Sequence, residues 1–234
     1  MPTPSNSSEN RPYVLINMAM SADGKIATAK SHFSRFGSTE DEANLFRIRS
    51  TVDGIMSGAT TISKERATLT LKSHPKQRAN RPDPLRIIVT STGTVSPDAP
   101  IFTDLGPPVL ILTTQSISET QLQAYQKLTT GIHRSRGKAI NWKSALKWLF
   151  QKWKIKRLLC EGGGILNQSL LRSNLVDELN LTICPVVVGG TNASTIADGD
   201  AFPSLNDCSK WKIVSRKQFS QECFLRLIRA DISE

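Results

Sequence analysis

The chain has 234 residues, of which 38% are hydrophobic and 6% are aromatic, enough for one large globular domain or two small ones. Nothing approaches the roughly 18 uninterrupted apolar residues of a membrane span, and the first ten residues lack the apolar region of a signal peptide, so a cytoplasmic protein without membrane association is expected. The formal net charge of +10 raises the question of an anionic partner.

The positive charge is concentrated between Glu119 and Glu161, an interval without any acid. Its cations interleave with the polar positions of an amphipathic pattern, and neither a nucleic-acid-binding motif nor an aromatic stacking platform accompanies them. Most are therefore expected to be solvated, and no nucleic-acid partner is expected, whereas attraction for phosphorylated small molecules stays open. The cations of this interval are Lys127, Arg134, Arg136, Lys138, Lys143, Lys147, Lys152, Lys154, Lys156 and Arg157.

The N-terminal part of the chain begins with a polar segment. Residues 1–11, rich in Pro, Ser, Thr and Asn, are expected to form a disordered tail, and residues 12–234 a single domain. Residues 13–20 predict a buried strand, which the turn-forming residues 21–24 close.

The next segment predicts a helix, a strand and a second helix. A Ser/Thr-x-x-acid pattern that starts at Ser38 predicts a helix to about Ser50. Residues 53–58 predict a short strand, which leaves through a glycine into a short helix.

Prolines and cations then mark a connection. Residues 72–84 predict a basic surface loop, residues 85–90 and 109–113 predict strands, and residues 118–128 predict a helix.

Asn141 is a candidate N-cap for a helix whose apolar residues recur at helical spacing, as expected for a helix lying on a sheet. Trp148 lies off that stripe and is expected to face solvent or a partner subunit. The stripe consists of Trp142, Ala145, Leu146, Leu149, Phe150 and Trp153.

Residues 158–166 carry the strongest local signal, an apolar strand that passes through three glycines into a helical pattern reaching about Ser173. Glycines at such a turn let the backbone approach a ligand closely, and the helix start offers N–H groups to an anion. Neither a GxGxxG nor a Gly-Lys-Ser/Thr motif is present, so the pattern indicates an anion or cofactor site outside the Rossmann and P-loop types; a tight turn is the alternative.

The C-terminal part predicts strands. Residues 179–188 read as a long apolar strand ended by two glycines, and residues 211–219 and 223–228 as an antiparallel pair. Strands interleaved with helices, followed by a strand pair, predict an α/β fold with a mostly parallel sheet and an antiparallel C-terminal edge.

Residue types that would perform chemistry by themselves are scarce. The histidines His32, His74 and His133 are isolated and predicted to lie at the surface, so no metal site is expected. The four cysteines form no CxxC pair and are expected to be free and mostly buried. Because no GxSxG elbow is present either, the sequence favours chemistry that is supplied by a bound cofactor.

Four ordered segments carry a resemblance to a known family. They are residues 17–27 (NMAMSADGKIA), 48–61 (IRSTVDGIMSGATT), 86–91 (RIIVTS), and 160–167 (CEGGGILN) with 175–179 (LVDEL). In this order and spacing they resemble the pyrimidine reductases of riboflavin biosynthesis.

The resemblance implies a dihydrofolate-reductase-like α/β fold, a homodimer, and NADPH-dependent reduction of the ribosyl group of a phosphorylated ribosylaminopyrimidine to ribityl. The zinc-deaminase ligand pattern of the bifunctional relatives is missing from this sequence, which favours a stand-alone reductase. A paralogous reductase of another pterin- or pyrimidine-like compound, and a non-catalytic nucleotide-binding protein, stay open.

The resemblance also implies a set of site residues. Glu65 stands where an aspartate is usual, and Lys72 where an arginine is usual; a lysine keeps the charge for a 5′-phosphate but loses the bidentate fork. The cofactor-binding residues implied are Met20, Thr61, Glu65, Ser91, Gly163, Gly164, Ile165, Leu166 and Asn167. The substrate-binding residues implied are Asn17, Arg49, Leu69, Lys72 and Glu161.

Two acids are candidates for catalysis. Hydride transfer to a ribosylamine or its open-chain imine needs a proton or a stabilised charge at nitrogen, and Asp23, Glu161 or a water molecule could provide it. For Asp23, stabilisation of the turn with Gly24 is an equally weighted alternative. Ile165 and Leu166 would also be explained as core residues.

Overall fold

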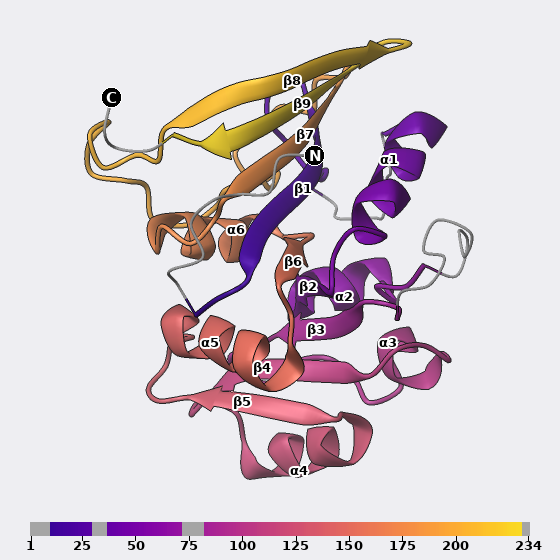
Figure 1. Cartoon of the computed structure of the whole chain (residues 1–234), viewed down its shortest axis with the longest axis vertical. Helices are drawn as coiled ribbons and strands as arrows, with labels where there is room; N and C mark the ends of the chain where they lie inside the picture. The colour runs from indigo at the N-terminus through magenta and orange to yellow at the C-terminus, as the bar shows by residue number, and fades with distance from the viewer. Residues whose placement is uncertain (1–9, 30–36, 72–81, 231–234) are drawn as a thin grey trace.

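The computed structural model describes residues 10–29, 37–71 and 82–230, and one nine-stranded sheet runs through them in the order β5-β4-β3-β2-β6-β1-β7-β9-β8 (Figure 1). The strands are β1 (Tyr13–Ser21), β2 (Gly54–Gly58), β3 (Leu85–Val89), β4 (Val109–Thr114), β5 (Gly131–Ser135), β6 (Arg157–Cys160), β7 (Glu178–Cys184), β8 (Trp211–Phe219) and β9 (Glu222–Arg229). The helices are α1 (Thr39–Arg49), α2 (Ala59–Glu65), α3 (Pro100–Thr103), α4 (Glu119–Leu128), α5 (Trp142–Trp153) and α6 (Gly164–Arg172).

Strands β1 to β7 pair in parallel, and β9 and β8 extend the sheet antiparallel to β7 and to each other. Strand β1 lies between β6 and β7, so that Ile16 is in register with Cys160 on one side and Leu179 on the other. The predicted fold class is confirmed. The carboxyl ends of the parallel strands meet at one edge of the sheet, where α/β proteins bind their ligands.

Alternating side chains of the central strands fill a core on each face of the sheet, as the period of two requires. In β1, Val14 and Ile16 belong to the core that α5 and α6 cover, whereas Leu15 belongs to the core under α1, α2, α3 and α4. Trp142 packs in the first core as predicted. Trp148, expected to face solvent or a partner, instead packs against Trp153 and His133, with ring centroids 5.8 and 5.6 Å away.

The same contact corrects the surface prediction for His133. Its ring is partly buried on β5, its Nδ1 atom has no hydrogen-bond partner among the residues that the structure describes, and burial lowers its pKa. His32 and His74 lie outside the described residues. Cys160 and Cys184 are buried, and all four thiols are free.

Three elements differ from the sequence-based expectation. Strand β7 ends at Cys184 and not near Val188, because Pro185 has no N–H for the ladder and the N–H of Val186 turns back to the Cys184 carbonyl at 2.8 Å. Strand β5 and the four-residue helix α3 were not predicted, since neither carries an apolar period long enough to be recognised.

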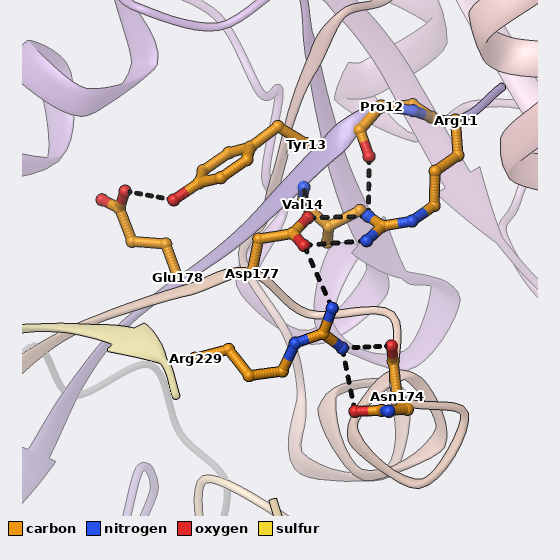
Figure 2. Close-up of polar contacts among 8 residues, drawn as sticks. All are labelled: Arg11, Pro12, Tyr13, Val14, Asn174, Asp177, Glu178 and Arg229. Atoms are coloured by element: carbon orange, nitrogen blue, oxygen red, sulfur yellow. Dashed lines mark hydrogen bonds and ion pairs between the residues drawn. The ribbon is translucent and has the colours of Figure 1, made fainter. Parts of the chain in front are cut away.

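Figure 2 shows a polar cluster that ties β1 to the segment before β7 and to the end of β9. Arg11 donates from its two terminal nitrogens to the Asp177 carboxylate at 2.7 and 2.8 Å, and Asp177 also accepts from the N–H of Val14 at 2.8 Å. Arg229 approaches Asp177 to 3.6 Å and donates to Asn174 Oδ1 at 2.8 Å. Arg11, which the sequence placed in the tail, is therefore held by the domain.

In the ranges that the structure describes, no helix has the length and apolar character needed to cross a bilayer.

Candidate active site

A cleft of about 1130 Å³ lies at the carboxyl edge of the parallel strands. Its walls come from β1, α1, the β2–α2 junction, the segment after β3, the loop after β5, and the glycine turn between β6 and α6. All four segments with family resemblance contribute lining residues. Residues 86–91 do so through their last three residues only.

The glycine turn is built into the end of β2. The carbonyl oxygen of Gly162 accepts from the N–H of Gly58 at 2.8 Å, and the N–H of Gly163 donates to Thr61 Oγ1 at 3.0 Å. A Cβ atom at Gly163 would lie 3.1 Å from Thr61 Oγ1, and one at Gly164 would collide with Thr195 and Asp198. Glycine is therefore required by close backbone approach, which brings the start of α6 to the floor of the cleft.

The first turn of α6 presents backbone N–H groups at this floor, as an anion site requires. Ile165 lines the cleft with 75% of its surface exposed, so its interpretation as a core residue is wrong. Leu166 is 7% exposed and does belong to the core. Asn167 is 1% exposed, donates to the Ile196 carbonyl at 2.8 Å, and thereby anchors the loop after β7 beside the glycine turn.

The other predicted cofactor residues divide between the cleft and the core. Thr61, Glu65 and Ser91 line the cleft. Met20 is partly buried against the core under α5 and α6 and lies outside the cleft lining. The cleft residues Thr61, Glu65 and Ser91, together with the glycine turn, fit a nucleotide cofactor. The turn offers backbone N–H groups to an anion, and the exposed Ile165 offers an apolar surface.

Arg49 and Glu161 form the central ion pair of the cleft. Arg49 donates from Nε and Nη2 to the two carboxylate oxygens of Glu161, each at 2.6 Å, and from Nη1 to the Thr70 carbonyl at 2.8 Å. Burial works to lower the pKa of Arg49, but the charge and hydrogen bonds of Glu161 outweigh it and raise that pKa. Both side chains are nearly covered, so the pair presents a rigid polar surface to the cleft.

The remaining predicted substrate residues are distributed unevenly. Asn17 lines the cleft from β1 and is mostly buried. Leu69 also lines it, but its nearly complete burial limits it to packing. Lys72 lies outside the described residues.

Asp23 is not among the residues that line the cleft, and it holds a loop. Its carboxylate accepts from Ser21 Oγ at 2.6 Å and from the N–H groups of Val188 and Gly189 at 3.0 and 2.7 Å. These bonds, the one from Ser21 foremost, lower the pKa of Asp23 to about 2. A carboxylate of this kind is a weak candidate for a proton donor near neutral pH, which favours the turn-stabilising alternative.

Two lining residues were not singled out as site residues from the sequence, although Lys138 belongs to the cationic interval 127–157. Asp198 closes the far side of the glycine turn, where its N–H donates to the Gly164 carbonyl at 3.1 Å and its Oδ1 accepts from Thr195 Oγ1 at 2.7 Å. Lys138 reaches the cleft from the loop after β5. Both lie in loops outside the resembling segments, and only the fold brings them to the site. Among the described residues, no group of His, Cys, Asp and Glu could hold a metal ion.

Comparisons with known proteins agree with this architecture. A family model described as the RibD C-terminal domain matches residues 12–225. A relative from Methanothermobacter thermautotrophicus named 2,5-diamino-6-ribosylamino-4(3H)-pyrimidinone 5′-phosphate reductase is 30% identical, over 87% of this chain and 91% of the relative. One of the same name from Aquifex aeolicus is 32% identical, over 84% and 87%. The solved structure of Acinetobacter baumannii RibD superposes with a TM-score of 0.76 at 21% identity, over 96% of this chain and 60% of that one, which supports the fold.

Proposed function

This chain belongs to the RibD C-terminal domain family, and from that premise we propose that it is an oxidoreductase of riboflavin biosynthesis. It reduces the ribosyl group of 2,5-diamino-6-ribosylamino-4(3H)-pyrimidinone 5′-phosphate, or of its deaminated form, to ribityl, with NADPH as the cofactor. The observation that carries the proposal is the bidentate Arg49–Glu161 pair, which lies beside a glycine turn at the carboxyl edge of the sheet.

The residues of the cleft would divide the work between cofactor and substrate. The start of α6, Thr61 and the exposed Ile165 hold the nucleotide, which supplies a hydride equivalent when bound. Three of the five N–H donors of Arg49 are used inside the protein, so two are left for the substrate. Each oxygen of Glu161 can accept one further hydrogen bond, which suits the amino groups of a pyrimidine.

Of the three candidate proton sources for the reduced ribosylamine, Glu161 and water are retained. Glu161 adjoins the cleft and a water molecule can enter it, whereas Asp23 is bound to the loop after β7. We assign Asp23 to the loop and leave proton delivery to Glu161 or water.

Turnover of the purified protein tests the proposal. With NADPH and the diaminopyrimidine 5′-phosphate, reduced-nicotinamide absorbance should fall and a product two hydrogens heavier should appear by mass. If neither occurs while an authentic reductase turns over in parallel, the assignment fails. The deaminated pyrimidine and pterin-like compounds, offered with NADPH held fixed, identify the preferred substrate or reveal a paralogous reductase.

The proposed assembly is a homodimer. Trp148, expected from the sequence to face solvent or a partner subunit, packs within the chain, and the apolar strand β7 is paired on both sides, so neither supports a dimer contact. Support comes instead from the edge strand β8, which exposes Ile213, Val214 and Phe219. Light scattering of the eluting protein should give a mass of about two chains, and a one-chain mass at micromolar concentration would refute the dimer.

A further inference from the structure

Four cationic side chains line the cleft in the described part of the chain: Arg49, Lys64, Arg66 and Lys138. Arg49 is neutralised by Glu161, and Lys64 and Arg66 flank the acidic Glu65 at the end of α2. Lys138 is exposed and forms no ion pair with any residue in the described ranges. Its charge is therefore available to an anion in the cleft.

The fold holds the backbone on both sides of Lys138. The N–H of Gly137 donates to Gln115 Oε1 at 3.0 Å, and the N–H of Gln115 donates to the Gly137 carbonyl at 3.1 Å. On the other side, the N–H of Asn141 donates to Ser135 Oγ at 3.0 Å. The loop is thus positioned, while the Lys138 side chain has no ion-pair partner in the described part of the chain.

The sheet order tells which part of a dinucleotide lies near Lys138. Asn17, a substrate residue according to the family resemblance, is on β1, on one side of β6. Ser91 follows β3 and Lys138 follows β5, both on the other side. A hydride donor must face the substrate, so the nicotinamide half lies toward β1 when the pyrophosphate meets the glycine turn. The adenosine half then extends toward β3, which is two strands or about 10 Å from β6. Strand β5 lies two strands beyond β3, and the end of β4 connects the two segments: Thr114 donates to the Ser91 carbonyl at 3.1 Å, and the N–H of Gln115 donates to the Gly137 carbonyl next to Lys138.

Hydroxyl groups accompany Lys138 on that side. Ser91, Thr92 and Thr94 line the cleft after β3, and all three are exposed. An ammonium group that shares a cleft with hydroxyl donors is suited to a phosphate dianion and gives little to the neutral hydroxyl that NADH carries at the same place.

We infer that Lys138, together with Ser91 and Thr92, binds the 2′-phosphate of the adenosine ribose and makes this protein prefer NADPH to NADH. The inference rests on the proposed function, because it takes the cleft to be a nicotinamide-dinucleotide site. It singles out one member of the cationic interval 127–157 as a ligand-binding residue.

Equilibrium binding of the two nucleotides, without pyrimidine, tests the inference. Dissociation constants for NADPH and NADH are measured by nicotinamide fluorescence for the wild type, Lys138→Ala, Lys138→Arg, Arg66→Ala and the control Lys143→Ala. Lys143 is exposed on α5 outside the cleft, so its loss removes the same charge from a neighbouring surface. Lys138→Ala should raise the NADPH constant about tenfold and leave the NADH constant unchanged, as expected for one charge-assisted contact. Lys138→Arg should stay near the wild type, and so should Lys143→Ala.

Three results would overturn the inference. The NADPH constant could be unaffected by Lys138→Ala, both constants could rise together, or the preference could disappear with Arg66→Ala instead. A wild type that binds both nucleotides equally also overturns it, yet leaves the reductase assignment standing. A wild type that binds neither nucleotide refutes the proposed function itself.

Discussion

Glu161 lies between Arg49 and the glycine turn, the two main features of the cleft. Its carboxylate binds Arg49, and the glycines that follow it form the turn at the start of α6. Replacing one member of a covered ion pair leaves the other charge short of partners, so the loss exceeds that of a surface pair. Glu119 with Arg134, 3.1 Å apart and well exposed, provides such a surface pair for comparison.

Glu161→Gln should therefore impair pyrimidine use selectively. We expect kcat/KM for the pyrimidine to fall by roughly 100-fold, or about 2.7 kcal/mol. The NADPH dissociation constant should change little, since the glycine turn is held by Gly58 and Thr61. Steady-state kinetics and nucleotide titration measure the two effects. Glu119→Gln should leave both values unchanged; equal losses in the two variants would show that the Arg49–Glu161 pair has no special role.

The hydrogen bonds of Asp23 join the β1 turn to the loop after β7. The pH dependence of the stability of Asp23→Asn, relative to the wild type, tests their contribution. The folded-state pKa of Asp23, about 2, lies below its ordinary value of 3.8, so its stabilising effect is present above that ordinary value and is lost as pH falls toward 2. The variant should melt below the wild type at pH 7, and the difference should shrink between about pH 4 and pH 2. Thermal unfolding at several pH values measures it, and a difference independent of pH would contradict this role.

Helix α1 brings Arg49 to the cleft, and the hairpin of β8 and β9 fixes the start of that helix. Ser38, the N-cap, accepts from the N–H of Asp41 at 3.3 Å, while its own N–H and hydroxyl donate to the buried carboxylate of Glu222 at 2.7 and 2.5 Å. Cys184 lies beside this carboxylate, and burial, with the nearby charge of Glu222, raises the pKa of its thiol to about 12. The N-cap of α1 is thus also a tertiary contact.

Ser38→Ala should cost more than an ordinary cap. Ser118, which caps α4 and accepts from the N–H of Gln121 at 3.2 Å, is the matched control. We expect Ser118→Ala to lower the free energy of unfolding by about 1 kcal/mol. For Ser38→Ala we expect about 2 to 3 kcal/mol, because a donor to the buried Glu222 is also lost. Urea unfolding of both variants decides, and equal losses would show that the Glu222 contact adds nothing.

The two ends of the described chain meet at Asp177, which binds Arg11 before β1 and approaches Arg229 at the end of β9 (Figure 2). The side chains of Arg11 and Asp177 are 14% and 13% exposed, so solvent screens their attraction only in part. The cluster joins β1 at the centre of the sheet to the antiparallel extension. We therefore expect its loss to lower the free energy of unfolding of the whole domain and not only that of one strand.

A double-mutant cycle with Arg11→Ala and Asp177→Ala measures this coupling. We expect a coupling free energy of about 1 to 3 kcal/mol in chemical unfolding. Arg229→Ala, whose partner lies at 3.6 Å, should couple to Asp177→Ala more weakly. Additive effects for Arg11 and Asp177 would mean that the pair does not join the ends of the domain.

Much of the architecture could be predicted because its signals are local. The apolar run of β1, the helix start at Ser38, the cap Asn141 and the stripe on α5 each arise within a few residues. Strand β5 could not be predicted from the sequence, because it is short and carries a histidine and an arginine. Strand β7 was predicted too long because an apolar run continues past Pro185, where the ladder stops.

The sequence by itself determined the family, the order of most elements and the glycine turn, since four ordered motifs and local periodicity depend only on neighbours along the chain. The tertiary structure decided what each candidate does. It paired Arg49 with Glu161 across 112 positions, bound Asp23 to the loop after β7, buried Asn167 and left Ile165 uncovered. It also brought Lys138 to the cleft. The physical reason is that hydrogen bonds and burial act between groups close in space, and sheet order sets that closeness independently of distance along the sequence.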